Sequence, residues 1–175
     1  MNTKKVTAII IICILGIFLL YMLPTDVVTI SNAVVNEETG DIAFAYADSS
    51  GRIDVIRVVV FNKEGEKLFS KSFEINGSHT DLCFSENKLY VSVARIDEFY
   101  CFEMDGSDSE PALTLDDVKA YNKFSGWEHS FGKYTYSYGD YLYCYNEPSV
   151  FSHYSSVTIT YGNETKIIFE SPVSE

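Results

Sequence analysis

Six tyrosines in two short runs are the side chains in this sequence whose spacing best suits ligand binding. They are Tyr134, Tyr136, Tyr138, Tyr141, Tyr143 and Tyr145. A two-residue hairpin turn at Gly139-Asp140 would pair the two runs so that all six rings share one face of a sheet. A tyrosine ring combines apolar area with a hydroxyl group, so this face is a candidate platform for a sugar, a peptide or another flat ligand.

The alternative for the same six residues is structural. Tyrosine favours strands, and the face could pack against another sheet. Six hydroxyl groups are hard to bury with every one hydrogen-bonded, so we expect the face to be partly wet.

Motifs for catalysis or metal binding are missing elsewhere in the sequence. The histidines at 79, 129 and 153 lie in no HExxH pattern and near no CxxC pair, so no zinc site is predicted. Ser130 lacks the first glycine of a GxSxG nucleophile elbow. The carboxylates between Asp105 and Glu110 lack EF-hand spacing, and we expect an ordinary hairpin turn there. We predict no catalytic residue, no metal and no cofactor. An enzyme whose site assembles from loops is the alternative.

Three cysteines lie outside the amino-terminal segment, each within a strand-like run: Cys83, Cys101 and Cys144. Three is an odd number, so at most one intramolecular disulfide can form. We expect small buried residues with free thiols. A disulfide between two of them is the alternative.

The amino terminus resembles a membrane anchor. Residues 6–23 carry no charge and would span about 27 Å as a helix, near the thickness of the bilayer core. Lys4 and Lys5 precede this run and the next basic residue is Arg52, which places the amino terminus inside. A signal peptide cleaved after Ala33 is the alternative. The predicted organisation is a cytoplasmic tail (1–5), a transmembrane signal anchor (6–23), a linker (24–33) and an extracytoplasmic domain (34–175).

The charge and aromatic content exclude two classes of protein. The chain has 13 basic and 25 acidic residues and a net charge of −12. A nucleic-acid binder needs a basic face that neutralises phosphates, so we predict no nucleic-acid partner. Aromatic residues make up 15% of the chain, which is too many for a disordered protein.

The part after Pro24 has the pattern of an all-β domain. Ile42, Phe44 and Tyr46 alternate with small residues, which is typical of a strand. Similar runs alternate with turn residues at 53–61, 67–75, 89–93, 99–104, 157–161 and 166–169. One segment, 114–121, resembles a short helix with Thr114 as its cap.

A weak repeat runs through the domain. Polar turns at Gly40-Asp41, Asn87-Lys88 and Gly139-Asp140 each precede a strand, and their starts lie 47 and 52 residues apart. This pattern resembles the blade repeat of β-propellers, which implies about three antiparallel blade-like units. A closed propeller needs four or more blades, so two chains could form a six-unit ring, or another protein could cover the strand edges. We favour an open or sandwich-like arrangement.

The sequence therefore predicts a single-pass membrane protein with an all-β extracytoplasmic domain and a non-catalytic binding role. Its expected partners are the membrane, through residues 6–23, and another protein or a second copy of the chain. An enzyme acting on the cell envelope and a strand-edge subunit of a larger membrane complex are the alternatives.

Overall fold

The computed structural model describes residues 28–48, 55–74, 80–93, 98–119, 124–148 and 154–171. Both the predicted cytoplasmic tail and the predicted transmembrane segment lie outside these ranges. Within these ranges, no helix has the length and apolar character needed to cross a membrane.

Twelve strands form three antiparallel sheets. The first sheet holds, in chain order, β1 (Ile30–Val35), β2 (Ile42–Asp48), β3 (Val55–Phe61) and β4 (Lys67–Glu74). The second sheet holds β5 (Thr80–Ser85), β6 (Lys88–Val93) and β7 (Glu98–Glu103). The third sheet, in the same order along the chain, holds β8 (Glu128–Ser130), β9 (Lys133–Tyr138), β10 (Tyr141–Asn146), β11 (Ser156–Tyr161) and β12 (Glu164–Glu170). These sheets confirm the predicted all-β class.

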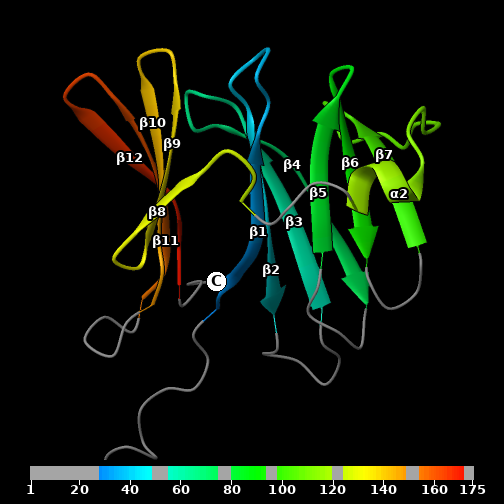
Figure 1. Ribbon diagram of the computed structural model, residues 1–175, viewed down its shortest axis with the longest axis horizontal. Coiled ribbons are helices and arrows are strands. Elements are labelled where there is room, and N and C mark those ends of the chain that lie inside the picture. The colour runs from blue at the N-terminus through cyan, green and yellow to red at the C-terminus, as the bar shows by residue number, and fades with distance from the viewer. Residues whose placement is uncertain are drawn as a thin grey trace, which may run out of the picture.

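The three sheets stand face to face, with the first sheet in the middle (Figure 1). Strand β2 shows why the first sheet is buried on both faces. Phe44 and its neighbours Ile42 and Tyr46 pack in the core toward the third sheet. Ala43 and Ala45 lie in the separate core against the second sheet. The predicted alternation is therefore confirmed, and the small alanines allow the second sheet to approach closely.

A short helix, α2 (Leu115–Lys119), covers the outer face of the second sheet (Figure 1). Val118 is buried there beside Cys83, Tyr90 and Cys101. The helix begins as predicted, because the backbone N–H of Asp117 donates to the Thr114 hydroxyl at 3.3 Å and the Thr114 N–H donates to the Asp117 carboxylate at 2.8 Å. A six-unit ring of two chains would place a further sheet on this face, where α2 already lies.

The first strand begins earlier than the sequence suggests. Strand β1 starts at Ile30, inside the segment expected to be a linker, and Ala33 pairs with Phe44. The polar residue Asn32 is only 1% exposed. Its Nδ2 donates to the backbone oxygen of Thr80 at 3.1 Å, and its Oδ1 accepts from the backbone N–H of Phe124 at 3.2 Å. These two partners are far away in the sequence, so the local pattern gave no sign of them.

The repeat predicted from the sequence corresponds to equivalent hairpins. Strands β2, β6 and β10 each follow a tight turn from the strand before them in the same sheet. The three turns lie at the same end of the molecule (Figure 1). This end brings segments from all three sheets together.

Candidate functional site

The tyrosine ladder has the predicted register. Strand β9 pairs with β10 across the two-residue turn Gly139-Asp140. The three cross-strand pairs are Tyr138 with Tyr141, Tyr136 with Tyr143, and Tyr134 with Tyr145. All six rings therefore lie on the face of the third sheet that packs against the first sheet.

Burial divides the ladder into two groups. Tyr143 and Tyr145 are fully buried, whereas the other four tyrosines are partly exposed. The two buried rings offer no surface to a ligand as the chain is folded. The expectation that the face is partly wet holds for the remaining four.

The ladder hydroxyls hold the first sheet in place. Tyr143 donates its hydroxyl to the backbone oxygen of Gly40, and Tyr138 donates to that of Glu38 at 2.8 Å. The hydroxyl of Tyr145 accepts from the backbone N–H of Ile30 at 3.2 Å. Three of the six tyrosines are thus bonded to backbone groups of β1 or the β1–β2 turn.

Gly40 lets the turn rest on the ladder. Its φ is +80°, in the left-handed region that favours glycine. A Cβ atom at this position would lie 2.6 Å from Cε1 of Tyr138. The contact between the turn and the tyrosine ring therefore depends on the absence of a side chain.

The acidity of the ladder follows its burial. Burial raises the pKa of Tyr145 to about 12 and moves the pKa of Tyr143 further in the same direction. Burial also raises the pKa of Tyr136, and the neighbouring Glu37 carboxylate adds to the effect. These hydroxyls are neutral at physiological pH and act as hydrogen-bonding groups, not as bases.

A groove of about 340 Å³ opens where the three sheets meet. One wall comes from the end of β1 and the β1–β2 turn, another from the β5–β6 turn, and a third from the third sheet. Its polar and aromatic lining residues include Asn36, Glu37, Glu38, Glu86, Ser125 and Tyr136. Of the six predicted site residues, only Tyr136 lines this groove.

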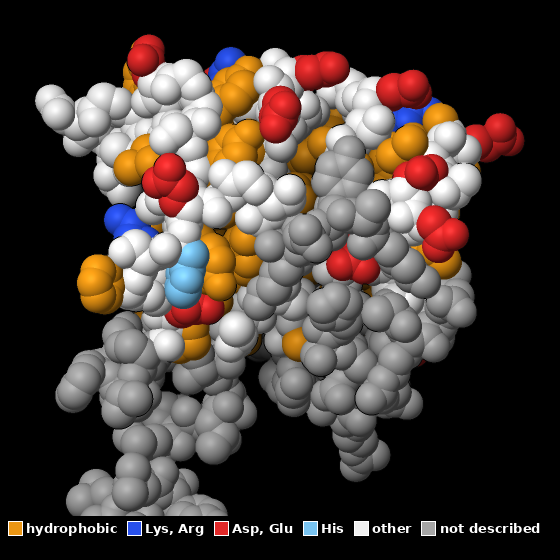
Figure 2. Space-filling view, viewed as in Figure 1, with side chains coloured by type: hydrophobic (Ala, Val, Ile, Leu, Met, Phe, Trp, Pro, Cys, Tyr) orange, Lys and Arg blue, Asp and Glu red, His pale blue; other side chains and the backbone are white. Residues whose placement is uncertain are grey.

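The groove is acidic. Glu37, Glu38 and Glu86 line it, and none of its lining residues within the described ranges is a lysine or an arginine. Acidic side chains are also more widely spread than basic ones over the face shown in Figure 2. A negative potential in a concave site concentrates cations near it.

Two further features set the geometry of the groove. Glu86 and Asn87 form the β5–β6 turn with φ of 51° and 56°, a left-handed conformation that is uncommon for residues other than glycine. Asn36 is only 4% exposed. Its Oδ1 accepts from the N–H of Glu38 at 2.9 Å, while its Nδ2 has no hydrogen-bond partner among the described residues.

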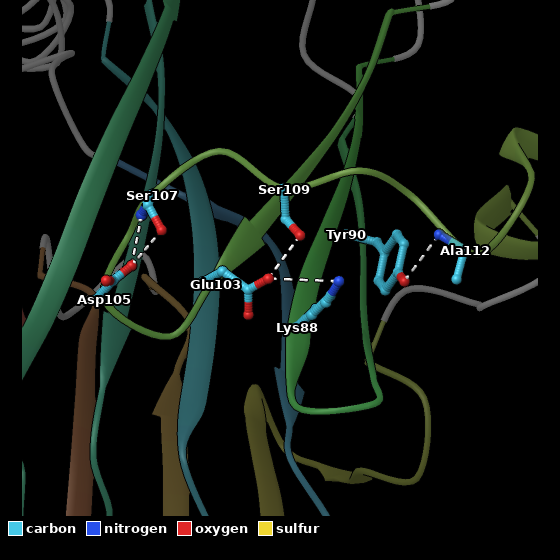
Figure 3. Close-up of polar contacts among 7 residues, drawn as sticks. All are labelled: Lys88, Tyr90, Glu103, Asp105, Ser107, Ser109 and Ala112. Carbon is cyan, nitrogen blue, oxygen red and sulfur yellow. Dashed lines mark hydrogen bonds and ion pairs between the residues drawn. The ribbon is translucent and has the colours of Figure 1, made fainter.

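A second polar cluster lies on the second sheet (Figure 3). The Glu103 carboxylate accepts from the Ser109 hydroxyl at 2.6 Å and lies 3.4 Å from the Lys88 ammonium. Both contacts hold the pKa of Glu103 below its ordinary value. The Tyr90 hydroxyl accepts from the N–H of Ala112 at 3.3 Å. These bonds fasten the segment after β7 to its sheet.

The predicted turn near Asp105 is confirmed in the same cluster. Asp105 accepts from both the N–H and the hydroxyl of Ser107, at 2.8 and 2.6 Å, and Gly106 has a φ of +83°. Among the described residues, no group of three His, Cys, Asp or Glu side chains is arranged to hold a metal ion.

Cys83, Cys101 and Cys144 are buried and form no disulfide, so the disulfide alternative for these three residues is wrong. Cys83 and Cys101 pair with Tyr90 from opposite sides, which places a whole strand between them. Burial raises the pKa of Cys101, and a protonated thiol is a poor nucleophile.

The histidines give no catalytic arrangement in the described part. His129 stacks on Tyr134 with ring centroids 4.3 Å apart, and its Nε2 lies 3.5 Å from the Glu147 carboxylate. The other two histidines, at 79 and 153, lie outside the described residues.

Sequence reasoning missed most of the groove because its residues come from turns of different sheets. The one local signal was the polar turn predicted at Asn87-Lys88, which the structure places one residue earlier, at Glu86-Asn87. Comparison of the chain with protein-family models, with curated proteins and with solved structures finds no match.

Proposed function

We propose that the chain is a single-pass membrane protein whose all-β domain is a non-catalytic binding module. The observation that carries this proposal is the groove of about 340 Å³ between the β1–β2 turn, the β5–β6 turn and the third sheet. Its volume lies within the usual range for small-ligand sites. The apolar, positively flanked segment 6–23 supports the membrane anchor.

The walls of the groove suit a binding role because they are fixed before a ligand arrives. The β1–β2 turn is held by the hydroxyls of Tyr138 and Tyr143. The β5–β6 turn is held by the register of its two strands, in which Ser85 pairs with Lys88. Preorganised walls reduce the entropy that is lost on binding.

The propeller-like interpretation belongs to the same proposal. Three sheets stacked face to face, with equivalent hairpin turns at one end, are compatible with three blades of an open propeller. In this interpretation the groove lies at the turn end of the stack, where residues of β1, β5 and β9 line it.

Site-specific photocrosslinking in native membranes tests the proposal. A photoreactive amino acid replaces Ser125, which is exposed and lines the groove. The matched control replaces Leu142, which is 38% exposed on the outer face of the third sheet. We expect a discrete adduct from position 125 and none from position 142. Adducts at neither position, or equally at both, would contradict a binding role for the groove.

A second candidate function is the strand-edge subunit. The eight-residue strand β4 forms one edge of the first sheet, and an edge strand can pair with a strand of another protein. A third photoreactive position at Ser72 of β4 separates the two functions. Adducts confined to position 72 would favour the strand-edge subunit over the groove.

A further inference from the structure

We infer that the groove binds a basic peptide segment, with a lysine or arginine side chain against its carboxylates and a backbone carbonyl at Asn36. This inference rests on the proposed function and adds the chemical class of the ligand. The partner is therefore expected to be a protein with an accessible basic segment.

Two walls of the groove carry negative charge. Glu37, Glu38 and Glu86 come from two different hairpin turns and line one groove. No ion pair among the described residues neutralises them. A cationic side chain placed between the two turns would be attracted by carboxylates on both sides.

A third wall of the groove carries an aromatic ring. Tyr136 lines the groove from the third sheet and remains partly exposed. The face of a tyrosine ring attracts an ammonium or guanidinium group. The carboxylates and the ring therefore favour the same kind of ligand group from different walls.

The groove is also lined by a residue with an unpaired hydrogen-bond donor. Asn36 lines the groove, is 96% buried, and its Nδ2 has no partner among the described residues. A buried donor without an acceptor costs free energy, which a ligand acceptor would recover. A bare cation offers no acceptor, whereas a peptide carries both a carbonyl oxygen and a cationic side chain.

The size of the groove agrees with a short peptide segment. A volume of about 340 Å³ is far larger than a single metal ion needs. It is at the lower end of the range for ligand sites. A few residues in an extended conformation would fill it.

Peptide binding to the full-length chain in a nonionic detergent tests the inference. The probe is a fluorescein-labelled tetralysine peptide, and fluorescence anisotropy measures its affinity at low and at physiological salt. The groove variant combines Glu37→Gln, Glu38→Gln and Glu86→Gln. The control variant makes the same change in net charge at exposed carboxylates elsewhere, with Glu110→Gln, Glu164→Gln and Glu170→Gln.

We expect the groove variant to lose at least about tenfold in affinity and the control variant less than about twofold, because exposed charges interact only at short range in salt. Equal losses in the two variants would overturn the inference, since the peptide would then respond only to net charge. Thermal unfolding of both variants is measured as a control, and we expect the groove substitutions to leave the fold intact.

A competition experiment tests the acceptor part of the inference. Spermidine carries several ammonium groups and no carbonyl oxygen. We expect it to displace tetralysine only at concentrations well above those of unlabelled tetralysine. Equal potency would overturn the role assigned to Asn36.

The two proposals fail in distinguishable ways. If tetralysine does not bind while position 125 still forms a discrete adduct in membranes, the ligand class is wrong and the binding module stands. If neither experiment gives a signal, the groove is not a binding surface.

Discussion

Replacing Asn32 with alanine is expected to destabilise the domain more than the same substitution at an exposed asparagine. The substitution removes two buried hydrogen bonds, to the backbone oxygen of Thr80 and from the backbone N–H of Phe124. Each backbone group that loses its partner in a buried site costs about 1–3 kcal/mol. The sum is about 4 kcal/mol, and at about 2–4 °C per kcal/mol for a domain of this size the melting temperature falls by about 8–16 °C.

Thermal unfolding of the full-length chain in a nonionic detergent, followed by circular dichroism, measures this effect. Asn62→Ala is the matched control. Asn62 also makes two side-chain hydrogen bonds, both to Glu66, but they are exposed and local. We expect this control to lower the melting temperature by less than about 3 °C, because water replaces the lost partners.

Asn32→Asp separates the two bonds. A carboxylate can still accept from the N–H of Phe124 but cannot donate to the oxygen of Thr80. Protonation at low pH restores a donor, so part of the lost stability should return as the pH falls through the pKa of the new carboxyl group. A melting temperature of Asn32→Ala within 3 °C of the original chain would refute the claim that this side chain joins the sheets.

Three further predictions concern the ladder and the thiols. Gly40→Ala should destabilise the domain by about 1–2 kcal/mol more than Gly139→Ala, as measured by urea unfolding, because only the Gly40 Cβ would collide with a tyrosine ring. The folded pKa of Tyr145 is about 12 and the unfolded one about 10. The unfolded state therefore releases its proton first, and stability should fall from pH 10 to pH 12, with a shallower fall in Tyr145→Phe. A thiol reagent with mass-spectrometric readout should modify three cysteines only after denaturant is added: Cys83, Cys101 and Cys144.

The tyrosine ladder and strand β2 were predictable because their signals are local. A two-residue turn fixes the pairing of every residue that flanks it, so Gly139-Asp140 alone determines which tyrosines face each other. In β2, Phe44 alternates with alanines, and this pattern indicates which face of the strand carries large side chains and which carries small ones. The short helix after Thr114 was also encoded locally, in its capping residues.

The first strand and the groove could not be predicted in the same way. Ser31 and Asn32 interrupt the apolar pattern of β1, and Asn32 is tolerated inside only because two distant backbone groups satisfy its amide. The groove depends on which turns meet in space, and this is determined by the packing of separate sheets. For the same reason the sequence showed six equivalent tyrosines, whereas the fold gives them different exposures.

If residues 6–23 anchor the chain as predicted, the position of Ile30 sets the greatest distance between the domain and the bilayer. With residues 6–23 in the membrane, as predicted, seven peptide units separate Leu23 from Ile30, and their full extension is about 24 Å. Strand β1 adds about 20 Å between its start and the groove beside Asn36. Because the chain enters at one end of β1 and the groove opens at the other, an anchor at residues 6–23 would leave the groove on the side of the domain away from the lipid. The two lengths add to about 45 Å. A partner anchored in the same membrane would therefore reach the groove at high local concentration only if its binding segment lies within about 45 Å of the membrane surface.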